Sequence, residues 1–148
     1  MRIRSYLPSD FERLHEIDQI CFERDIAYSH AELGFYLRDS RSVARVAEVP
    51  GQIAGFVLGR VERNFIAHVI TLDVAPEWRR QGVGTRLMRA VHCEFLRRNA
   101  EISVLEVSTE NTTARRFYER LQYVHAGILP GYYSGRLDAC RMVRRLKQ

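Results

Sequence analysis

Apolar and polar residues recur along the chain with two periods, and each change of period marks the border of a predicted element. Apolar residues at helical spacing follow Ser9, and they recur in a long segment after Gly84. A shorter helix is expected up to Leu37, and another over 112–121. Apolar runs of strand length lie at 2–6, 42–48, 52–62, 67–74, 102–107, 123–129 and 139–146.

Local signals place the ends of several elements. Ser9-Asp10-Phe11-Glu12 and Ser29-His30-Ala31-Glu32 both match the capping box that opens a helix. A loop is expected at 22–28, a turn at Pro50-Gly51, and a second loop over the Pro-Gly-Tyr-Tyr-Ser-Gly stretch between the last two strands.

The predicted order is β-α-α-β-β-β-α-β-α-β-β, which indicates an α/β (α+β) fold in one domain, residues 1–148. We expect a mixed sheet of about seven strands flanked by about four helices. The strand–helix–strand unit from Ala67 to Val107 should be a parallel crossover. Because ligands bind beyond the carboxyl ends of such strands, chemistry is expected just after Val74 and near Val107.

Composition narrows the class of protein. The chain has 148 residues, 46% hydrophobic and 28% charged, which is typical of one soluble globular domain. Its longest apolar run, Ile53 to Leu58, is too short for a membrane span, and we expect no signal peptide.

The charge balance favours an anionic ligand. The net charge is 23 − 18 = +5, and Lys147 is the single lysine among the basic residues. Such a balance suits a phosphorylated cofactor, an acidic protein or RNA, or it is a basic bias of a solvated surface. The basic residues are scattered and lack an aromatic repeat, which argues against a nucleic-acid partner.

Cysteine usage points to a reducing compartment. Cys21, Cys93 and Cys140 are odd in number and widely spaced, without a Cys-x-x-Cys motif. We therefore expect neither a disulfide framework nor a metal site, and we expect a cytoplasmic location.

The turn after Val74 carries the first functional signal. Gly82 and Gly84 lie where a strand passes into a helix, so backbone N–H groups at the helix start are left to bind an anion such as a pyrophosphate. Arg79 and Arg80 add positive charge. A P-loop would need a lysine here, and a dinucleotide motif would need glycine at Leu87. A purely structural turn is the alternative.

This turn resembles the acetyl-CoA signature of the GNAT N-acetyltransferases, Gln/Arg-x-x-Gly-x-Gly/Ala, filled here by Arg79, Gly82 and Gly84. The resemblance implies that acetyl-CoA is the cofactor and acetyl donor. It implies that the CoA pyrophosphate is held by the backbone of six residues, Arg79, Arg80, Gln81, Gly82, Val83 and Gly84. The strand edge at Leu72, Asp73 and Val74 would pair with the pantetheine arm.

The segment from Leu105 to Tyr118 carries the second signal. Glu106 stands inside an apolar strand, where a carboxylate is costly unless a cleft solvates it or a cation pairs with it. Burial would raise its pKa and make it a stronger base, whereas the alternative is a partner for an arginine. Asn111 and Tyr118 are seven residues apart, so on a helix they face the same groove about 10.5 Å apart. Simple packing is the alternative for Tyr118.

This segment resembles the GNAT subgroup that acetylates protein N-termini, especially the ribosomal-protein alanine N-acetyltransferases, in Leu-Glu-Val, Asn111, Ala114 and Tyr118. The resemblance implies that Glu106 is the general base, that Tyr118 is the acid facing the thiol, and that Asn111 holds the cofactor. Under this hypothesis the peptide entrance is lined by Tyr28, Tyr132 and Tyr133. The chain departs from the subgroup at Ser108, where the subgroup has arginine, and in the 22–30 loop.

The lead hypothesis is therefore acetyl transfer to the α-amino group of a protein N-terminus, with a ribosomal protein as one such partner. An α-amine has a pKa near 7.7–8 and lysine near 10.4, so one carboxylate suits the α-amine better. Direct attack in a ternary complex is expected, because the sequence shows no nucleophile–base constellation that would form an acyl-enzyme. Cys140 is the only candidate nucleophile near the site. The alternatives are a small amine such as a polyamine or aminoglycoside, and a non-catalytic acyl-CoA- or RNA-binding module. Monomer and homodimer both stay open.

Overall fold

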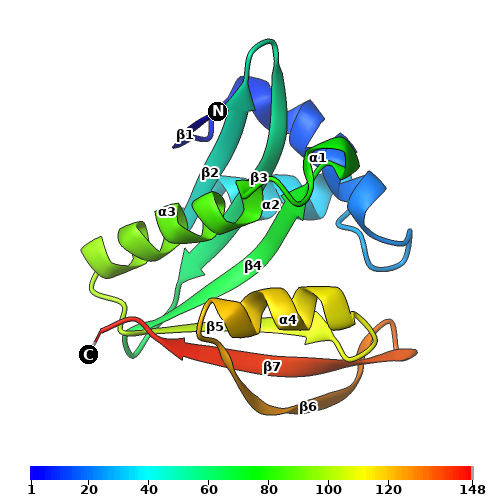
Figure 1. Cartoon of the computed structure of the whole chain (residues 1–148), viewed down its shortest axis with the longest axis vertical. Helices are drawn as coiled ribbons and strands as arrows, with labels where there is room; N and C mark the ends of the chain where they lie inside the picture. Colours follow the sequence, from blue (N-terminus) through cyan, green and yellow to red (C-terminus); the bar gives the residue numbers. More distant parts are fainter. Residues whose placement is uncertain (148) are drawn as a thin grey trace.

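The computed structural model describes residues 1–147 and contains one seven-stranded mixed sheet with the strand order β1-β2-β3-β4-β5-β7-β6 (Figure 1). The strands are β1 (Arg2–Ser5), β2 (Ser42–Val49), β3 (Gln52–Val61), β4 (Ile66–Val74), β5 (Ile102–Ser108), β6 (Val124–Tyr133) and β7 (Leu137–Arg145). The helices are α1 (Phe11–Cys21), α2 (His30–Arg38), α3 (Val83–Arg97) and α4 (Thr112–Arg120), with 3₁₀ turns η1 (Pro8–Asp10) and η2 (Pro76–Trp78). The predicted fold class is confirmed.

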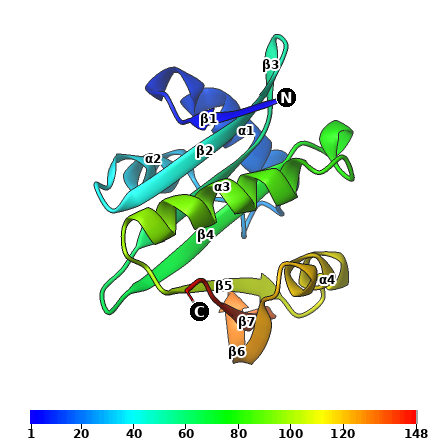
Figure 2. The same cartoon turned by 60° about the vertical axis from the view of Figure 1, so that its left-hand side comes forward.

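The helices divide between the two faces of the sheet. The helix α3 crosses β2, β3 and β4 on one face, whereas α1 and α2 cover the opposite face (Figure 2). The stripe of α3 that faces the sheet contains Leu87, Met88, Val91 and Phe95, all fully buried. Because burying each such side chain contributes about 1.5–3 kcal/mol, this helix holds the β1–β4 half of the sheet together.

The sheet opens in its middle, between β4 and β5. These strands are parallel, as the crossover predicts, but they pair only from Ile66–Ile102 to His68–Val104. An extra residue in β4 opposite Leu58/Gly59 then shifts its register against β3. Beyond His68 the two strands diverge, so the end of β4 and the end of β5 face each other without pairing.

Two local predictions are wrong. Ser9 does not cap α1, because it lies inside η1, and the Asp10 carboxylate instead accepts the N–H of Leu7. The stretch from Pro130 to Tyr133 is not a loop but belongs to β6, which stays paired with β7 through an irregular register shift. The capping box at Ser29 and Glu32 is confirmed by both of its hydrogen bonds.

Within residues 1–147, no helix combines the length and the apolar character that a membrane crossing requires.

Candidate active site

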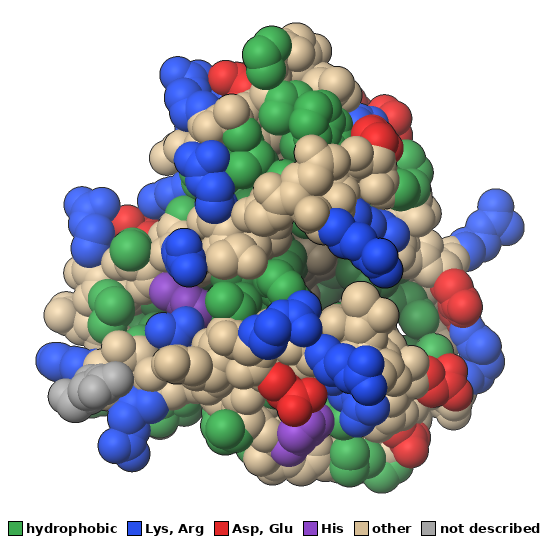
Figure 3. Space-filling view, viewed as in Figure 1, with side chains coloured by type: hydrophobic (Ala, Val, Ile, Leu, Met, Phe, Trp, Pro, Cys, Tyr) green, Lys and Arg blue, Asp and Glu red, His purple; other side chains and the backbone are tan. Residues whose placement is uncertain are grey.

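A cleft of about 950 Å³ fills the opening between the two halves of the sheet, at the C-terminal end of β4. It is lined by the edge of β4 at Leu72 and Val74, by the N-terminus of α3, and by one face of α4. Figure 3 shows a hollow near the middle of this face, with hydrophobic side chains inside it and Lys/Arg side chains around it. The arginines that line the cleft are Arg79, Arg80, Arg116 and Arg120.

The turn between β4 and α3 is shaped by two left-handed residues, Arg80 (φ 61°) and Gly82 (φ 82°). Gly82 is the residue before α3, and its conformation suits glycine because no Cβ is present. The first α3 residues that follow have no carbonyl of a preceding turn to bind, so their N–H groups and the helix dipole face the cleft. Gly84 has a different role: a Cβ there would meet the Phe117 ring at 3.2 Å, so its absence lets α3 and α4 approach.

The opposite wall of the cleft is α4. The Asn111 side chain lines the cleft and also caps the helix, since its Oδ1 accepts the Ala114 N–H at 3.1 Å. Tyr118 lies deeper, its ring packed edge-on against Phe117 and Tyr123. Burial raises the Tyr118 pKa well above its ordinary value, so its hydroxyl is protonated at neutral pH and can donate.

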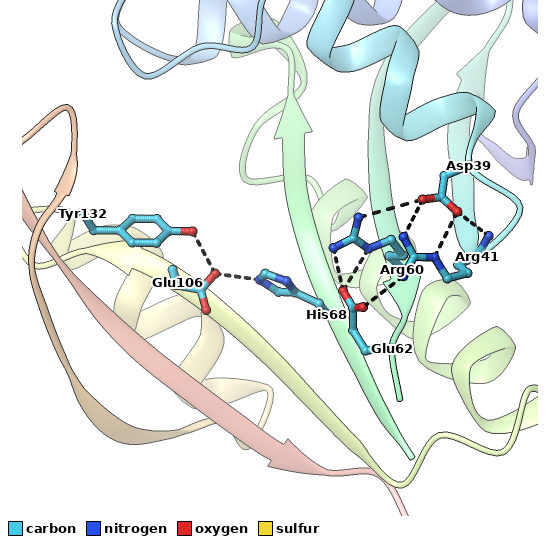
Figure 4. Close-up of polar contacts among 7 residues, drawn as sticks. All are labelled: Asp39, Arg41, Arg60, Glu62, His68, Glu106 and Tyr132. Carbon is cyan, nitrogen blue, oxygen red and sulfur yellow. Dashed lines mark hydrogen bonds and ion pairs between the residues drawn. The ribbon is translucent and has the colours of Figure 1, made fainter. Parts of the chain in front are cut away.

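Glu106 lies on the far side of the gap, where three side chains hold it. His68 Nε2 is 2.6 Å from its Oε1, the Tyr132 hydroxyl donates to the same oxygen at 3.3 Å, and Arg141 donates to Oε2 at 3.2 Å. The side chain of Glu106 is 5% exposed. Figure 4 shows the carboxylate between Tyr132 and His68, on strands from the two halves of the sheet.

The expected direction of the Glu106 pKa shift is wrong. Burial alone would raise the pKa, but the hydrogen bonds from His68 and Arg141, together with the positive charge of Arg141, outweigh it, and the net pKa is lowered. A carboxylate in this state is a weak base by itself. The arrangement can still move a proton, because an imidazole that donates through Nε2 keeps a lone pair on Nδ1.

His68 and Arg141 were missed from the sequence, because each lies on a strand and meets Glu106 only through the pairing of the sheet. His68 is opposite Val104, and Arg141 is opposite Glu106 itself. Beyond His68, Figure 4 shows a second polar cluster, formed by the segment between α2 and β2 and by the end of β3. Its members are Asp39, Arg41, Arg60 and Glu62, which pair with one another.

Tyrosines from two separate elements meet above Glu106. Tyr28 packs edge-on against Tyr36 at 5.7 Å, and its hydroxyl donates to the Ile70 carbonyl. Tyr132 and Tyr133 pack against each other at 4.9 Å. Tyr28 and Tyr36 lie near Tyr132, so the structure brings the two groups of tyrosines together. That Tyr28, Tyr132 and Tyr133 line a peptide entrance stays a prediction.

Two loops next to these tyrosines are joined to each other. The Arg136 side chain pairs with Asp25 and Glu23, and the Ser134 hydroxyl donates to the Asp25 carbonyl at 2.8 Å. These contacts join the loop after β6 to the loop between α1 and α2. We call this set of contacts the loop tie.

Two residues that were predicted to hold the cofactor through their backbone have side chains with partners outside the cleft. The Asp73 side chain is buried against α1 rather than in the cleft, and the Gln81 amide donates to the Glu77 carbonyl. Cys140 is buried in the core, on β7 opposite Val107. Cys21 lines the cleft instead, donating to the Val74 carbonyl, and burial raises its pKa to about 11. A thiol held in that state is a poor nucleophile.

The cleft suits an anionic, elongated ligand. Left-handed turn residues, outward N–H groups and four lining arginines match a diphosphate, and the unpaired edge of β4 matches an extended amide chain. Over residues 1–147, no group of three or more potential metal ligands is assembled.

A sheet that opens in its middle, with an anion-binding turn at the gap, is the architecture of an acyl-CoA-dependent transferase. The chain belongs to the acetyltransferase (GNAT) family, whose sequence profile matches residues 10–123. It is 33% identical to an uncharacterized N-acetyltransferase of Methanocaldococcus jannaschii, over 98% of this chain and 92% of that protein. It is 27% identical to an N-alpha-acetyltransferase of Sulfurisphaera tokodaii, covering 98% and 93%. The structure matches the ribosomal-protein-S18-alanine N-acetyltransferase from Escherichia coli with a TM-score of 0.89 and 25% identity, covering 99% and 94%.

Proposed function

We propose that this N-acetyltransferase transfers the acetyl group of acetyl-CoA to the α-amino group of a protein N-terminus. The observation that carries the proposal is the position of Glu106 and His68, which face each other across the gap between β4 and β5. The tyrosine-lined mouth above them suits a flexible peptide end. The family membership and the name of the Sulfurisphaera relative support the same substrate class.

The residues divide the reaction between the two walls of the site. Acetyl-CoA supplies the thioester, held by the turn of residues 79–84 and the edge of β4, with Asn111 at the start of α4. The Glu106–His68 pair accepts the proton of the attacking amine, and a backbone N–H near Val74 stabilises the carbonyl oxygen. As the carbon–sulfur bond breaks, Tyr118 gives its proton to the departing sulfur. The amine attacks directly, without an acyl-enzyme.

A small-amine substrate is the weaker candidate. A cationic small molecule would need free carboxylates in the 22–38 region. Glu23 and Asp25 are instead paired with Arg136, and the Glu32 carboxylate accepts the Ser29 N–H.

Mass spectrometry of a peptide panel tests the proposal. Each peptide is supplied in two forms, one with a free N-terminus and one already blocked there, and both contain an internal lysine. We expect one acetyl group on the free form and none on the blocked form. Acetylation of the blocked form would assign lysine as the acceptor, and no acetylated peptide at all would contradict the proposal.

We also propose a cytoplasmic protein whose physiological partner is the N-terminus of another protein, a ribosomal protein among the candidates. The three cysteines are unpaired, which suits a reducing compartment. Acetylated N-termini identified by comparing cells with and without this protein would name the partner.

A further inference from the structure

Two buried carboxyl groups meet underneath the end of β4. Asp18 comes from α1 and is 0% exposed, and Asp73 comes from β4 and is 1% exposed. Asp18 lies close enough to raise the pKa of Asp73 through its hydrogen-bonding oxygens and its charge. Figure 1 shows α1 next to the end of β4, and the two elements are in contact. Neither group takes part in the mechanism above.

The hydrogen bonds of the pair leave one oxygen of each carboxyl group uncommitted. Asp18 Oδ2 accepts the Tyr28 N–H at 2.7 Å, and Asp73 Oδ1 accepts the Thr71 hydroxyl. The other two oxygens, Asp18 Oδ1 and Asp73 Oδ2, are buried and have no hydrogen-bond donor within residues 1–147. Two acceptor oxygens can form a hydrogen bond only if a proton lies between them.

The surroundings favour the protonated pair. Burial, together with the hydrogen bond and the charge of Asp18, raises the Asp73 pKa well above its ordinary value, against the smaller effects of Thr71 and Arg79. Arg79 is exposed and directs its guanidinium at the Val74 carbonyl and the Cys21 sulfur. The other titratable groups facing the pair are Cys21, Tyr28 and Tyr118, all neutral at pH 7 because burial raises their pKa values.

We propose that Asp18 and Asp73 share a single proton, and that this O–H···O bond fastens α1 and the backbone of Tyr28 to the end of β4. The next residue, Val74, lines the cleft, and the Tyr28 ring lines the mouth. Both aspartates are positioning residues, since neither touches the acetyl-CoA cleft or the amine. The positioning role rests on the proposed function, whereas the shared proton does not.

A retained proton makes the stability of the protein depend on pH. The folded chain keeps a proton that both aspartates have lost in the unfolded chain above about pH 4. The folded-state pKa is raised, so the stabilisation is complete below the unfolded pKa and declines as pH rises toward the folded one. The unfolding equilibrium constant should therefore increase about tenfold per pH unit in that window from this pair alone.

The substitution Asp18→Asn isolates this effect. The amide introduced at position 18 places an N–H where the shared proton lies, so Asp73 can ionise without losing the hydrogen bond. The matched control is Glu16→Gln, which removes an exposed carboxylate from the same helix. Denaturant unfolding is measured for all three proteins from about pH 5 to 8. We expect the pH dependence of unfolding to be the same in E16Q and the wild type. The ratio of the wild-type unfolding equilibrium constant to that of D18N should increase about tenfold per pH unit.

Parallel pH dependences for D18N and the wild type would overturn the shared proton. Infrared spectroscopy of the wild type gives a second test if D18N does not fold. The infrared band of a protonated carboxylic acid should persist at neutral pH. Its absence would also contradict a proton shared by Asp18 and Asp73.

The positioning role is tested by the pH profile of peptide acetylation. Wild-type turnover should fall at the alkaline pH where the infrared band of the protonated carboxylic acid disappears. The turnover of D18N should not fall at that pH. A fall at the same pH in both proteins would remove the positioning role. If no peptide is acetylated by the wild type, the proposed function fails, and the unfolding data still test the shared proton.

Discussion

Glu106 illustrates how the chemistry of one residue is set by its neighbours. Its side chain is almost fully buried, and its carboxylate accepts hydrogen bonds from His68, Tyr132 and Arg141. Removing one partner of such a group leaves the others unsatisfied, which is more damaging than the loss of one surface hydrogen bond. The carboxylate therefore stays ionised at neutral pH and orients His68. Under the proposed function the pair, rather than either residue alone, accepts the proton.

We predict that Glu106→Gln lowers kcat for peptide acetylation by about 10²–10⁴-fold, the usual contribution of a positioned acid or base. The affinity for acetyl-CoA, measured by calorimetry, should not change, because Glu106 does not line the cleft. The matched control is Glu110→Gln, an exposed glutamate just after the same strand. Unchanged kcat in E106Q at matched pH would remove Glu106 from the mechanism.

The turn between β4 and α3 is the element on which the proposed binding of acetyl-CoA depends. Its two left-handed residues aim the first N–H groups of α3 at the cleft, and the Arg79 side chain folds back to donate to the Val74 carbonyl at 3.0 Å. Short-range geometry therefore determines both the anion site and the edge of β4 next to it.

We predict that Gly82→Ala weakens acetyl-CoA binding and lowers stability by about 1–2 kcal/mol, because an L-residue at φ 82° is strained. A Cβ at position 82 meets nothing within 4 Å, so the backbone alone is responsible. Gly51→Ala is the control, since Gly51 has φ 79°, equally open surroundings and a place in the distant β2–β3 turn. Equal losses of acetyl-CoA affinity in both variants would contradict a role for residue 82 in binding.

At the scale of the whole molecule, the site exists because the two halves of the sheet separate. Glu106 and Tyr118 belong to one half and His68 and Val74 to the other, and they meet only across the gap. The loop tie also joins the two halves, through segments more than a hundred residues apart in the chain.

We predict that Arg136→Ala raises KM for peptides while leaving the affinity for acetyl-CoA unchanged, because separated loops no longer shape the mouth. Exposed ion pairs contribute about 0–1 kcal/mol, so the thermal midpoint should hardly move. Arg24→Ala removes the same charge from the α1–α2 loop without breaking the tie. An equal KM for R136A and R24A would show that the tie does not shape peptide binding.

A buried histidine should make the fold sensitive to acid. His92 is 6% exposed, bonded to the Tyr123 hydroxyl at 2.7 Å, and its pKa is lowered to about 4 by burial and by the charge of Arg144. The unfolded histidine titrates near 6.5, so this stabilisation is complete above pH 6.5 and is lost as pH falls toward 4. The total is about 3 kcal/mol at most.

Thermal unfolding between pH 7 and 4.5 tests this prediction. The wild type should lose stability toward acid more steeply than His92→Gln, and His125→Gln, at an exposed position, should behave like the wild type. Identical slopes for the wild type and H92Q would contradict the burial of a neutral imidazole.

Periodicity and local motifs in the sequence alone were enough to predict the seven strands, the four helices and the glycine turn. Hydrophobic period is a property of neighbouring residues, and a capping box or a glycine before a helix acts within one turn, as at Ser29 and Gly82. The same local information misplaced the cap at Ser9 and the extent of β6, where pairing with β7 overrides the turn chemistry of Pro130 and Gly131.

Tertiary structure decided what could not be read locally. The partners of Glu106 come from β4, β6 and β7, and the direction of its pKa shift follows from them rather than from burial. The burial of Asp73 against Asp18 likewise depends on how α1 packs under β4. Sequence spacing determines which residues share a face, whereas electrostatics depends on distances between residues far apart in the chain, and only the packed sheet and helices set those distances.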